Sequence, residues 1–264
     1  IPRMTRGAPL AIETRGLTRA FGSVLAVDGI DLAVPRGSLF GFLGANGAGK
    51  STTIRCLTGL LRPTGGSMRL LGIDPATDPV AVKRRVGVLP EDLGLFDKLS
   101  GADHLAFVGR VHGLPMDAVR DRSRELLALM DLEAAASSPA ADYSHGMRKK
   151  LALALALLPA PRLLFLDEPF EGIDAVASRQ IRDLLRDYVR GGGTVFLTSH
   201  VLAIVERLCD HLAVIHRGHL VAQGPAESLR AGAEGRTLEE IFLELVGAAG
   251  EARTRLTWLC APTA

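Results

Sequence analysis

Short apolar runs alternate with helical patterns along most of this chain. Each run is long enough for a buried strand but too short for a buried helix. Runs of this kind are typical of parallel sheets that helices cover on both faces. They are Val86–Leu89, Leu163–Leu166, Thr194–Thr198 and Leu212–Ile215. The alternation therefore predicts an α/β fold.

The two ends and the middle of the chain have different patterns. Strand-like segments at Leu10–Thr14, Leu25–Val34 and Ser38–Leu43 are separated by glycine and proline, and we expect them to form a β-rich lobe. Between residues 97 and 141 apolar side chains recur at helical spacing without a convincing strand, which predicts a helical insert. Near the end, an amphipathic helix is predicted by apolar residues three and four apart, namely Leu238, Ile241, Phe242, Leu245 and Val246.

Composition narrows the class of protein. The chain has 264 residues, 47% of them hydrophobic, so it can bury a sizeable core. Its formal net charge of +2 gives no electrostatic reason to expect nucleic acid as a partner. The 3 cysteines form no CxxC pair, which favours a reducing compartment. The longest apolar run, Leu151–Leu158, is far shorter than the roughly 20 residues of a membrane-spanning helix, and we find no secretory signal.

The segment Gly44–Ser51 reads GANGAGKS and fully matches the phosphate-binding loop, directly after an apolar strand. Its glycines let backbone N–H groups surround phosphate oxygens, and the following helix adds the positive end of its dipole. Lys50 can neutralise the terminal phosphates, and Ser51 can offer its hydroxyl to Mg²⁺. The alternative is an ordinary glycine-rich turn before a helix. The strand before the loop favours the phosphate site.

Two carboxylates follow the predicted strand Leu163–Leu166. Ligands bind α/β folds at the edge where strands end, so Asp167 and Glu168 are well placed for chemistry. Asp167 can hold Mg²⁺ through water, and Glu168 can polarise the water that attacks a γ-phosphate. On its own such a pair is more often a helix N-cap. Together with the phosphate loop, it favours nucleotide hydrolysis.

Tyr143–Arg148 resembles the signature motif of ATP-binding cassette (ABC) proteins, about two dozen residues before Asp167, as in that family. Ser144 can cap the helix that follows, so that its hydroxyl, the Gly146 amide and the helix dipole face an anion. A plain N-cap is the alternative. Pro169–Asp174 resembles the family's loop that crosses to a partner subunit.

Three further positions extend this resemblance. His200 follows a buried strand where the family has its switch histidine near the γ-phosphate. Phe21 matches the aromatic residue that stacks on adenine, the alternative being an ordinary core residue beside a turn. Glu91 stands where most of the family has glutamine, and either side chain can accept a bond from a metal-bound water or contact the membrane subunit. Further departures are His145, Ile173 and Ala175.

The resemblance implies a P-loop NTPase (RecA-like) core with an antiparallel β subdomain and a helical ABC subdomain. It divides the chain into a segment 1–9, an ABC ATPase domain 10–224 with its helical subdomain at about 97–158, a helical extension 225–246 and a flexible tail 247–264. The cofactors implied are ATP and Mg²⁺. The implied catalytic residues are Lys50, Glu168 and His200, and the implied metal ligands are Ser51, Glu91 and Asp167. Nucleotide contacts are implied for Phe21, Gly44, Asn46, Gly47, Ala48, Gly49, Lys50, Ser51, Thr52 and Asp174, and for Ser144 and Gly146 in trans.

The motifs resemble most the type-2 ABC exporter group, which includes drug and antibiotic exporters. The resemblance implies ATP hydrolysis that powers export, a second ABC ATPase subunit in a homo- or heterodimer, and membrane permease subunits on separate polypeptides. It also implies a peripheral position at the cytoplasmic face of a bacterial membrane. Two alternatives stay open. One is a non-transport ABC ATPase in translation or DNA repair, and the other is a binding module that has lost catalysis.

Overall fold

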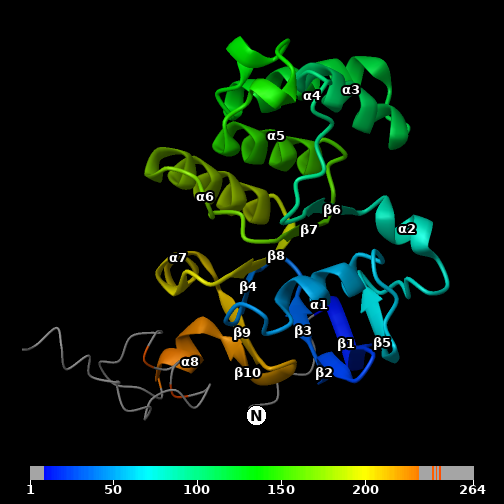
Figure 1. The fold of residues 1–264 in the computed structure, drawn as a ribbon, viewed down its shortest axis with the longest axis vertical. Helices are drawn as coiled ribbons and strands as arrows, with labels where there is room; N and C mark the ends of the chain where they lie inside the picture. The colour runs from blue at the N-terminus through cyan, green and yellow to red at the C-terminus, as the bar shows by residue number, and fades with distance from the viewer. Residues whose placement is uncertain (1–8, 232–239, 241, 243, 245–264) are drawn as a thin grey trace, which may run out of the picture.

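The computed structural model describes residues 9–231, together with residues 240, 242 and 244 (Figure 1). Its largest element is a 6-stranded sheet of order β10-β9-β4-β8-β7-β6. All neighbours in it are parallel except the β9–β10 hairpin. The strands are β4 (Leu39–Leu43), β6 (Val86–Leu89), β7 (Leu163–Leu166), β8 (Thr194–Ser199), β9 (His211–His216) and β10 (His219–Pro225). The four predicted parallel strands are therefore confirmed.

A second, 4-stranded antiparallel sheet forms the β-rich lobe. Its strands β2 (Val24–Ile30), β3 (Ala33–Pro35) and β5 (Gly65–Leu70) all pair with the long β1 (Leu10–Phe21). The prediction that Ser38–Leu43 belongs to this lobe is wrong. That segment is β4, which lies fully buried between β8 and β9 in the main sheet, because every residue of it is apolar or glycine.

The helical insert lies at the end of the main sheet beyond β6 and β7, away from the β-rich lobe (Figure 1). It contains α3 (Gly101–Val111), α4 (Met116–Leu129), two short 3₁₀ turns at Glu133–Ala135 and Ala140–Asp142, and α5 (His145–Leu157). Within residues 97–141 the structure has no strand, as predicted. α5 also packs against β6, so it connects the insert with the sheet.

Two apolar cores lie on the two faces of the main sheet because its strands alternate their side chains. Leu39 and Leu43 of β4 face the core shared with the helical insert and with α6 (Ala175–Arg190). Phe40 and Phe42 face the core shared with the β-rich lobe and with α1 (Lys50–Leu57). Aromatic rings stack across the second core, where the ring centroids of Phe40 and Phe196 lie 5.7 Å apart.

The remaining helices are α2 (Pro79–Lys83), α7 (Leu202–Leu208) and α8 (Ala226–Ala231). Of the predicted C-terminal helix, Phe242 is helical and packs against the first core, whereas Leu238, Ile241, Leu245 and Val246 lie outside the described residues. Segments 1–8 and 247–264 also lie outside them. Among the described helices, none combines the length and apolar character needed to cross a membrane.

Candidate functional site

The loop from Gly44 to Gly49 joins the end of β4 to the start of α1, as the sequence predicts. Gly47 and Gly49 have φ values of 78° and 110°, which L-residues with a side chain rarely adopt. A Cβ on Gly49 would also run into the carbonyl oxygen of Ala26. The glycines therefore allow a tight turn that a side chain at position 49 would block.

This loop has backbone hydrogen-bond donors without a partner in the part of the chain that the structure describes. Within the described residues, the amides of Gly47, Gly49 and Lys50 donate to no other group of the chain. The Lys50 ammonium is buried and donates to the carbonyl oxygens of Gly44 and Ala45 at 2.8 and 3.3 Å. Unpaired amides at a helix N-terminus, next to a lysine, are the donor set of an anion site.

The two carboxylates after β7 lie buried at the carboxyl edge of the main sheet, where Thr198 of β8 fixes them. The Thr198 hydroxyl donates to Asp167 Oδ1 at 2.5 Å and accepts the amide of Glu168 at 3.0 Å. Thr198 was not predicted as a site residue, because its role depends on the pairing of β7 with β8 and has no local sequence signal.

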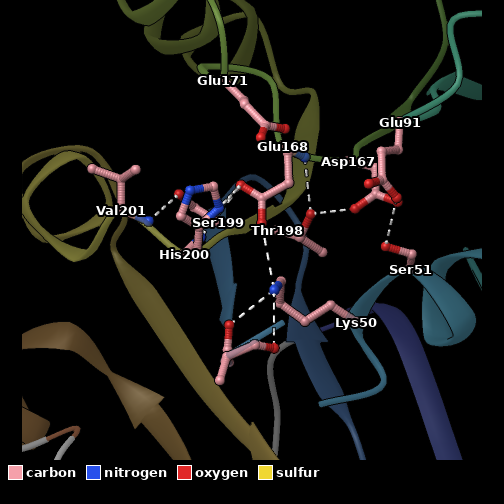
Figure 2. A network of polar contacts seen from close by, with 12 residues as sticks. Lys50, Ser51, Glu91, Asp167, Glu168, Glu171, Thr198, Ser199, His200 and Val201 are labelled. Carbon is pink, nitrogen blue, oxygen red and sulfur yellow. Dashed lines mark hydrogen bonds and ion pairs between the residues drawn. The ribbon is translucent and has the colours of Figure 1, made fainter. Parts of the chain in front are cut away.

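The Glu168 carboxylate lies between Lys50 and His200 (Figure 2). Its Oε1 is 3.4 Å from Lys50 Nζ, and its Oε2 is 3.0 Å from His200 Nδ1. The His200 amide also donates to Oε2 at 3.3 Å, whereas Oε1 accepts no hydrogen bond despite its burial. A buried carboxylate with one oxygen that accepts no hydrogen bond, beside a phosphate loop, is suited to accept a proton from water.

Oxygen ligands for a metal converge beside the loop. Ser51 Oγ donates to Glu91 Oε2 at 3.4 Å, and Asp167 is held nearby by Thr198 (Figure 2). Among the described residues, no cluster of His, Cys, Asp and Glu could hold a metal by itself. A small set of oxygen ligands fits Mg²⁺, which usually completes its shell with water and substrate phosphates.

These residues surround a pocket of about 400 Å³. It brings together most of the predicted site and adds Ala26 and Glu171, which the sequence did not single out. The predicted residues that line it are Asn46, Gly47, Gly49, Lys50, Ser51, Thr52, Glu91, Glu168 and His200. Gly44, Ala48 and the buried Asp167 are not among its lining residues.

Phe21 does not line the pocket either. It ends β1 with 48% of its surface exposed, and the guanidinium of Arg19 lies over its ring, 4.4 Å from the centroid. An exposed aromatic face can stack on a base. The alternative that Phe21 is an ordinary core residue is therefore not supported.

The signature residues Ser144 and Gly146 do not line the pocket of their own chain. Ser144 caps α5 by accepting the Met147 amide at 3.2 Å, as predicted. Asp174 also lies outside the pocket and caps α6. Hydrogen bonds from the amides of Ala177 and Val176 hold the pKa of its carboxyl below the usual range. Both of these capped helix N-termini are accessible to solvent.

A phosphate loop, a buried Asp-Glu pair and a histidine at the carboxyl edge of a parallel sheet define a nucleoside triphosphatase of the P-loop class. Comparison with known proteins then identifies its family. Residues 27–171 match the family model described as "ABC transporter". The chain belongs to the ABC transporter family and is an ABC ATPase.

Several curated relatives agree with this assignment. The chain is 41% identical to the daunorubicin/doxorubicin resistance ATP-binding protein DrrA of Streptomyces peucetius, over 84% of this chain and 67% of that one. It is 36% identical to a Nod factor export ATP-binding protein I of Ralstonia nicotianae, over 98% and 78% of the two chains. It is 34% identical to the bacitracin transport ATP-binding protein BcrA of Bacillus licheniformis, over 83% and 71%.

Solved structures confirm the fold. An ATP-binding subunit of an ABC transporter superposes with a TM-score of 0.84 at 31% identity, covering 89% of this chain and 99% of that chain. CbiO1 of Clostridium perfringens, part of the ABC transporter complex cbiONQ, has a TM-score of 0.75 at 27% identity and covers 86% and 92% of the two chains. The predicted P-loop NTPase core of the ABC type is therefore confirmed.

Proposed function

We propose that this chain binds and hydrolyses ATP to power export of a substrate through membrane permease subunits. The observation that carries the proposal is the Glu168 carboxylate, held between Lys50 and His200 at the edge of the phosphate-loop pocket. The export direction and the position at the cytoplasmic face of a bacterial membrane rest on the relatives, whose names describe drug resistance, Nod factor export and bacitracin transport.

In the proposed reaction the loop amides and Lys50 bind the phosphates of ATP. The Lys50 ammonium would leave the Gly44 and Ala45 carbonyls for the terminal phosphates, where it neutralises negative charge. Glu168 would then accept a proton from the attacking water, and His200 would hold its carboxylate through Oε2. Ser51, Asp167 and Glu91 would hold Mg²⁺, which would supply positive charge to offset the charge of the phosphates.

The ATP site needs a second copy or a related subunit. Ser144 and Gly146 are on the helical insert and do not line the pocket of their own chain. The exposed N-terminus of α5 still presents a hydroxyl, backbone amides and a positive dipole. We propose that it closes over ATP held by the phosphate loop of the partner, so that the working unit is a dimer.

A groove beside the Glu91 loop is suited to receive the permease. It has a volume of about 740 Å³ and runs from Pro90 and Leu93 to α2, α3 and α5. Leu60 and Val111 on its wall are each 67% exposed, which is costly for apolar side chains unless a partner covers them. We propose that a segment of a separate permease polypeptide docks here and receives the movement that ATP hydrolysis produces.

The test is ATP turnover by Glu168→Gln beside the parent, with size-exclusion chromatography of both in ATP and Mg²⁺. The amide cannot accept the water proton, so turnover should fall at least about a hundredfold while ATP stays bound in a stable dimer. Glu125→Gln is the control, because this exposed glutamate on α4 is far from the pocket. A parent that binds ATP without turnover, with or without a partner subunit, would favour a binding module instead.

A further inference from the structure

The structure contains a second buried ammonium group that the proposed reaction does not use. Lys149 of α5 is 3% exposed, and its Nζ donates to the carbonyl oxygens of Glu168 and Glu171 at 2.6 and 2.8 Å. Burial lowers the pKa of Lys149, and the surrounding carboxylates Glu171, Glu168, Asp167 and Glu91 act in the opposite direction. Burying a lysine ammonium costs free energy unless hydrogen bonds and nearby negative charge offset the loss of water.

These two bonds fix the turn that orients the catalytic carboxylate. Glu168 has a φ of 49°, in the left-handed region that is unfavourable for a residue with a side chain. Its amide is held by Thr198 and its carbonyl by Lys149. Strained backbone conformations persist only where the surroundings determine them. The Glu171 amide also donates to the Glu168 carbonyl, at 3.3 Å, so Lys149 and Thr198 are the two side chains that anchor the Glu168 backbone.

The first residue of the same helix, one turn before Lys149, also contacts this turn. The His145 ring at the start of α5 lies against Gly172, whose φ is 70°. A Cβ on Gly172 would be 2.7 Å from His145 Cδ2. α5 therefore contacts the turn at two points, one of them next to Ser144. A shift of α5 would move the turn that carries Glu168.

We infer that Lys149 is a positioning residue that sets the orientation of Glu168 and links the signature end of α5 to hydrolysis at the site of its own chain. The inference rests on the proposed function. In a dimer, the N-terminus of α5 would meet the ATP of the partner while Lys149 holds the carboxylate that acts on its own ATP. One rigid helix would thus connect the two sites.

The experiment compares Lys149→Met and Lys149→Arg with the parent in steady-state ATP hydrolysis. Methionine keeps the length of the side chain but donates no hydrogen bond, whereas arginine keeps charge and donors. We expect Lys149→Met to lower kcat about tenfold or more, with KM for ATP and the dissociation constant of ATP within about twofold of the parent. Lys149→Arg should recover part of kcat.

Lys150→Met is the matched control. Lys150 is the next residue of the same helix, and its ammonium pairs with Asp131 at 3.4 Å instead of with the turn. Lys150→Met should leave kcat within about twofold of the parental value. Thermal unfolding of all variants identifies loss of folded protein. If Lys149→Met does not fold, Lys149→Gln, whose polar side chain is shorter and uncharged and so cannot replace both bonds, should show a similar kcat loss without a change in ATP affinity.

Parental kcat in the folded Lys149→Met or Lys149→Gln variant would overturn this inference and leave the proposed function intact. An equal loss of ATP affinity and kcat would also overturn it, since a general structural defect affects both. If instead the parent binds no ATP, the proposed function fails and the inference fails with it. The two failures are therefore distinguishable in the same set of measurements.

Discussion

The side chains at this site contact and stabilise one another although they are distant in sequence. Glu168 is buried, so its negative charge needs nearby compensation. Lys50, the first residue of α1, provides a positive charge at 3.4 Å, and His200, after β8, provides a ring nitrogen at 3.0 Å. Removing either partner would leave a buried charge less compensated, which is more costly than losing a surface ion pair.

Thr198 offers a test at this scale. Its hydroxyl is fully buried, donates to Asp167 and accepts the Glu168 amide. Thr198→Val keeps the shape but leaves both partners without a hydrogen bond. We expect a loss of about 1–3 kcal/mol in the free energy of unfolding and a lower kcat, because both carboxylates lose their orientation. Urea denaturation and steady-state hydrolysis measure the two effects.

Thr58→Val is the control for this substitution. Thr58 is also buried, but its hydroxyl bonds only to backbone carbonyls at the end of α1, mainly that of Ile54 at 2.8 Å. It should cost some stability without a comparable change in kcat. Equal kcat losses in both variants would show that general destabilisation, and not the orientation of the carboxylates, explains the effect of Thr198→Val.

At the scale of elements, the site is built where strands end and helices begin. β4, β7 and β8 are parallel neighbours, so their carboxyl ends bring the phosphate loop, the carboxylates and His200 to one edge. The helices α5 and α6 begin with side-chain caps at Ser144 and Asp174. In contrast α1 begins at Gly49 without a side-chain cap, which leaves its N-terminal amides for phosphate.

Two glycines of the phosphate loop allow a prediction at this scale. Both have positive φ, but a Cβ on Gly49 would collide with the Ala26 carbonyl, whereas one on Gly47 would meet open space. Gly47→Ala should cost about 1–2 kcal/mol of backbone strain and still give a folded protein. Gly49→Ala should distort the loop and abolish ATP binding. Thermal unfolding and ATP titration distinguish the two, and equal behaviour would contradict the geometric argument.

At the scale of the whole molecule, the helical insert separates the signature from the phosphate loop. The N-terminus of α5 is solvent-accessible and lies outside the pocket of its own chain. The same chain carries an intact phosphate loop and an intact carboxylate pair. In the proposed dimer each chain would contribute two half sites, so a complete site would require two chains.

Mixing two defective variants tests this arrangement. Lys50→Ala removes the phosphate lysine, and Gly146→Asp places a negative charge at the signature without a close clash, since the nearest atom to its Cβ would be Ile173 Cγ2 at 3.9 Å. Each variant alone should be inactive. A mixture should regain hydrolysis, up to about a quarter of the parental rate, because the mixed dimer contains one site with both halves intact.

Size-exclusion chromatography of the mixture in ATP and Mg²⁺ establishes that mixed dimers form. If they form and remain inactive, the composite site is wrong or the two sites must act together. If Gly146→Asp alone hydrolyses ATP at the parental rate, the signature does not take part in catalysis. The control is each variant alone at the same total concentration as the mixture, and it should stay inactive at every concentration.

The sequence by itself determined the local structure of this protein. Apolar runs identified β6 to β9, since a strand buried on both faces must be apolar at every position. The phosphate loop and the Ser144 cap were predictable because they depend on near neighbours in the chain. β5 was missed because its residues, GGSMRL, are half of them exposed and show no apolar run.

The tertiary structure decided which distant residues meet. It placed β4 in the main sheet and not in the β-rich lobe, and it brought Thr198 and Lys149 to the Glu168 backbone from positions 30 and 19 residues away. A threonine in a strand and a lysine in a helix have no local pattern that indicates such roles. Their function follows from strand order and helix packing, which are properties of the folded chain as a whole.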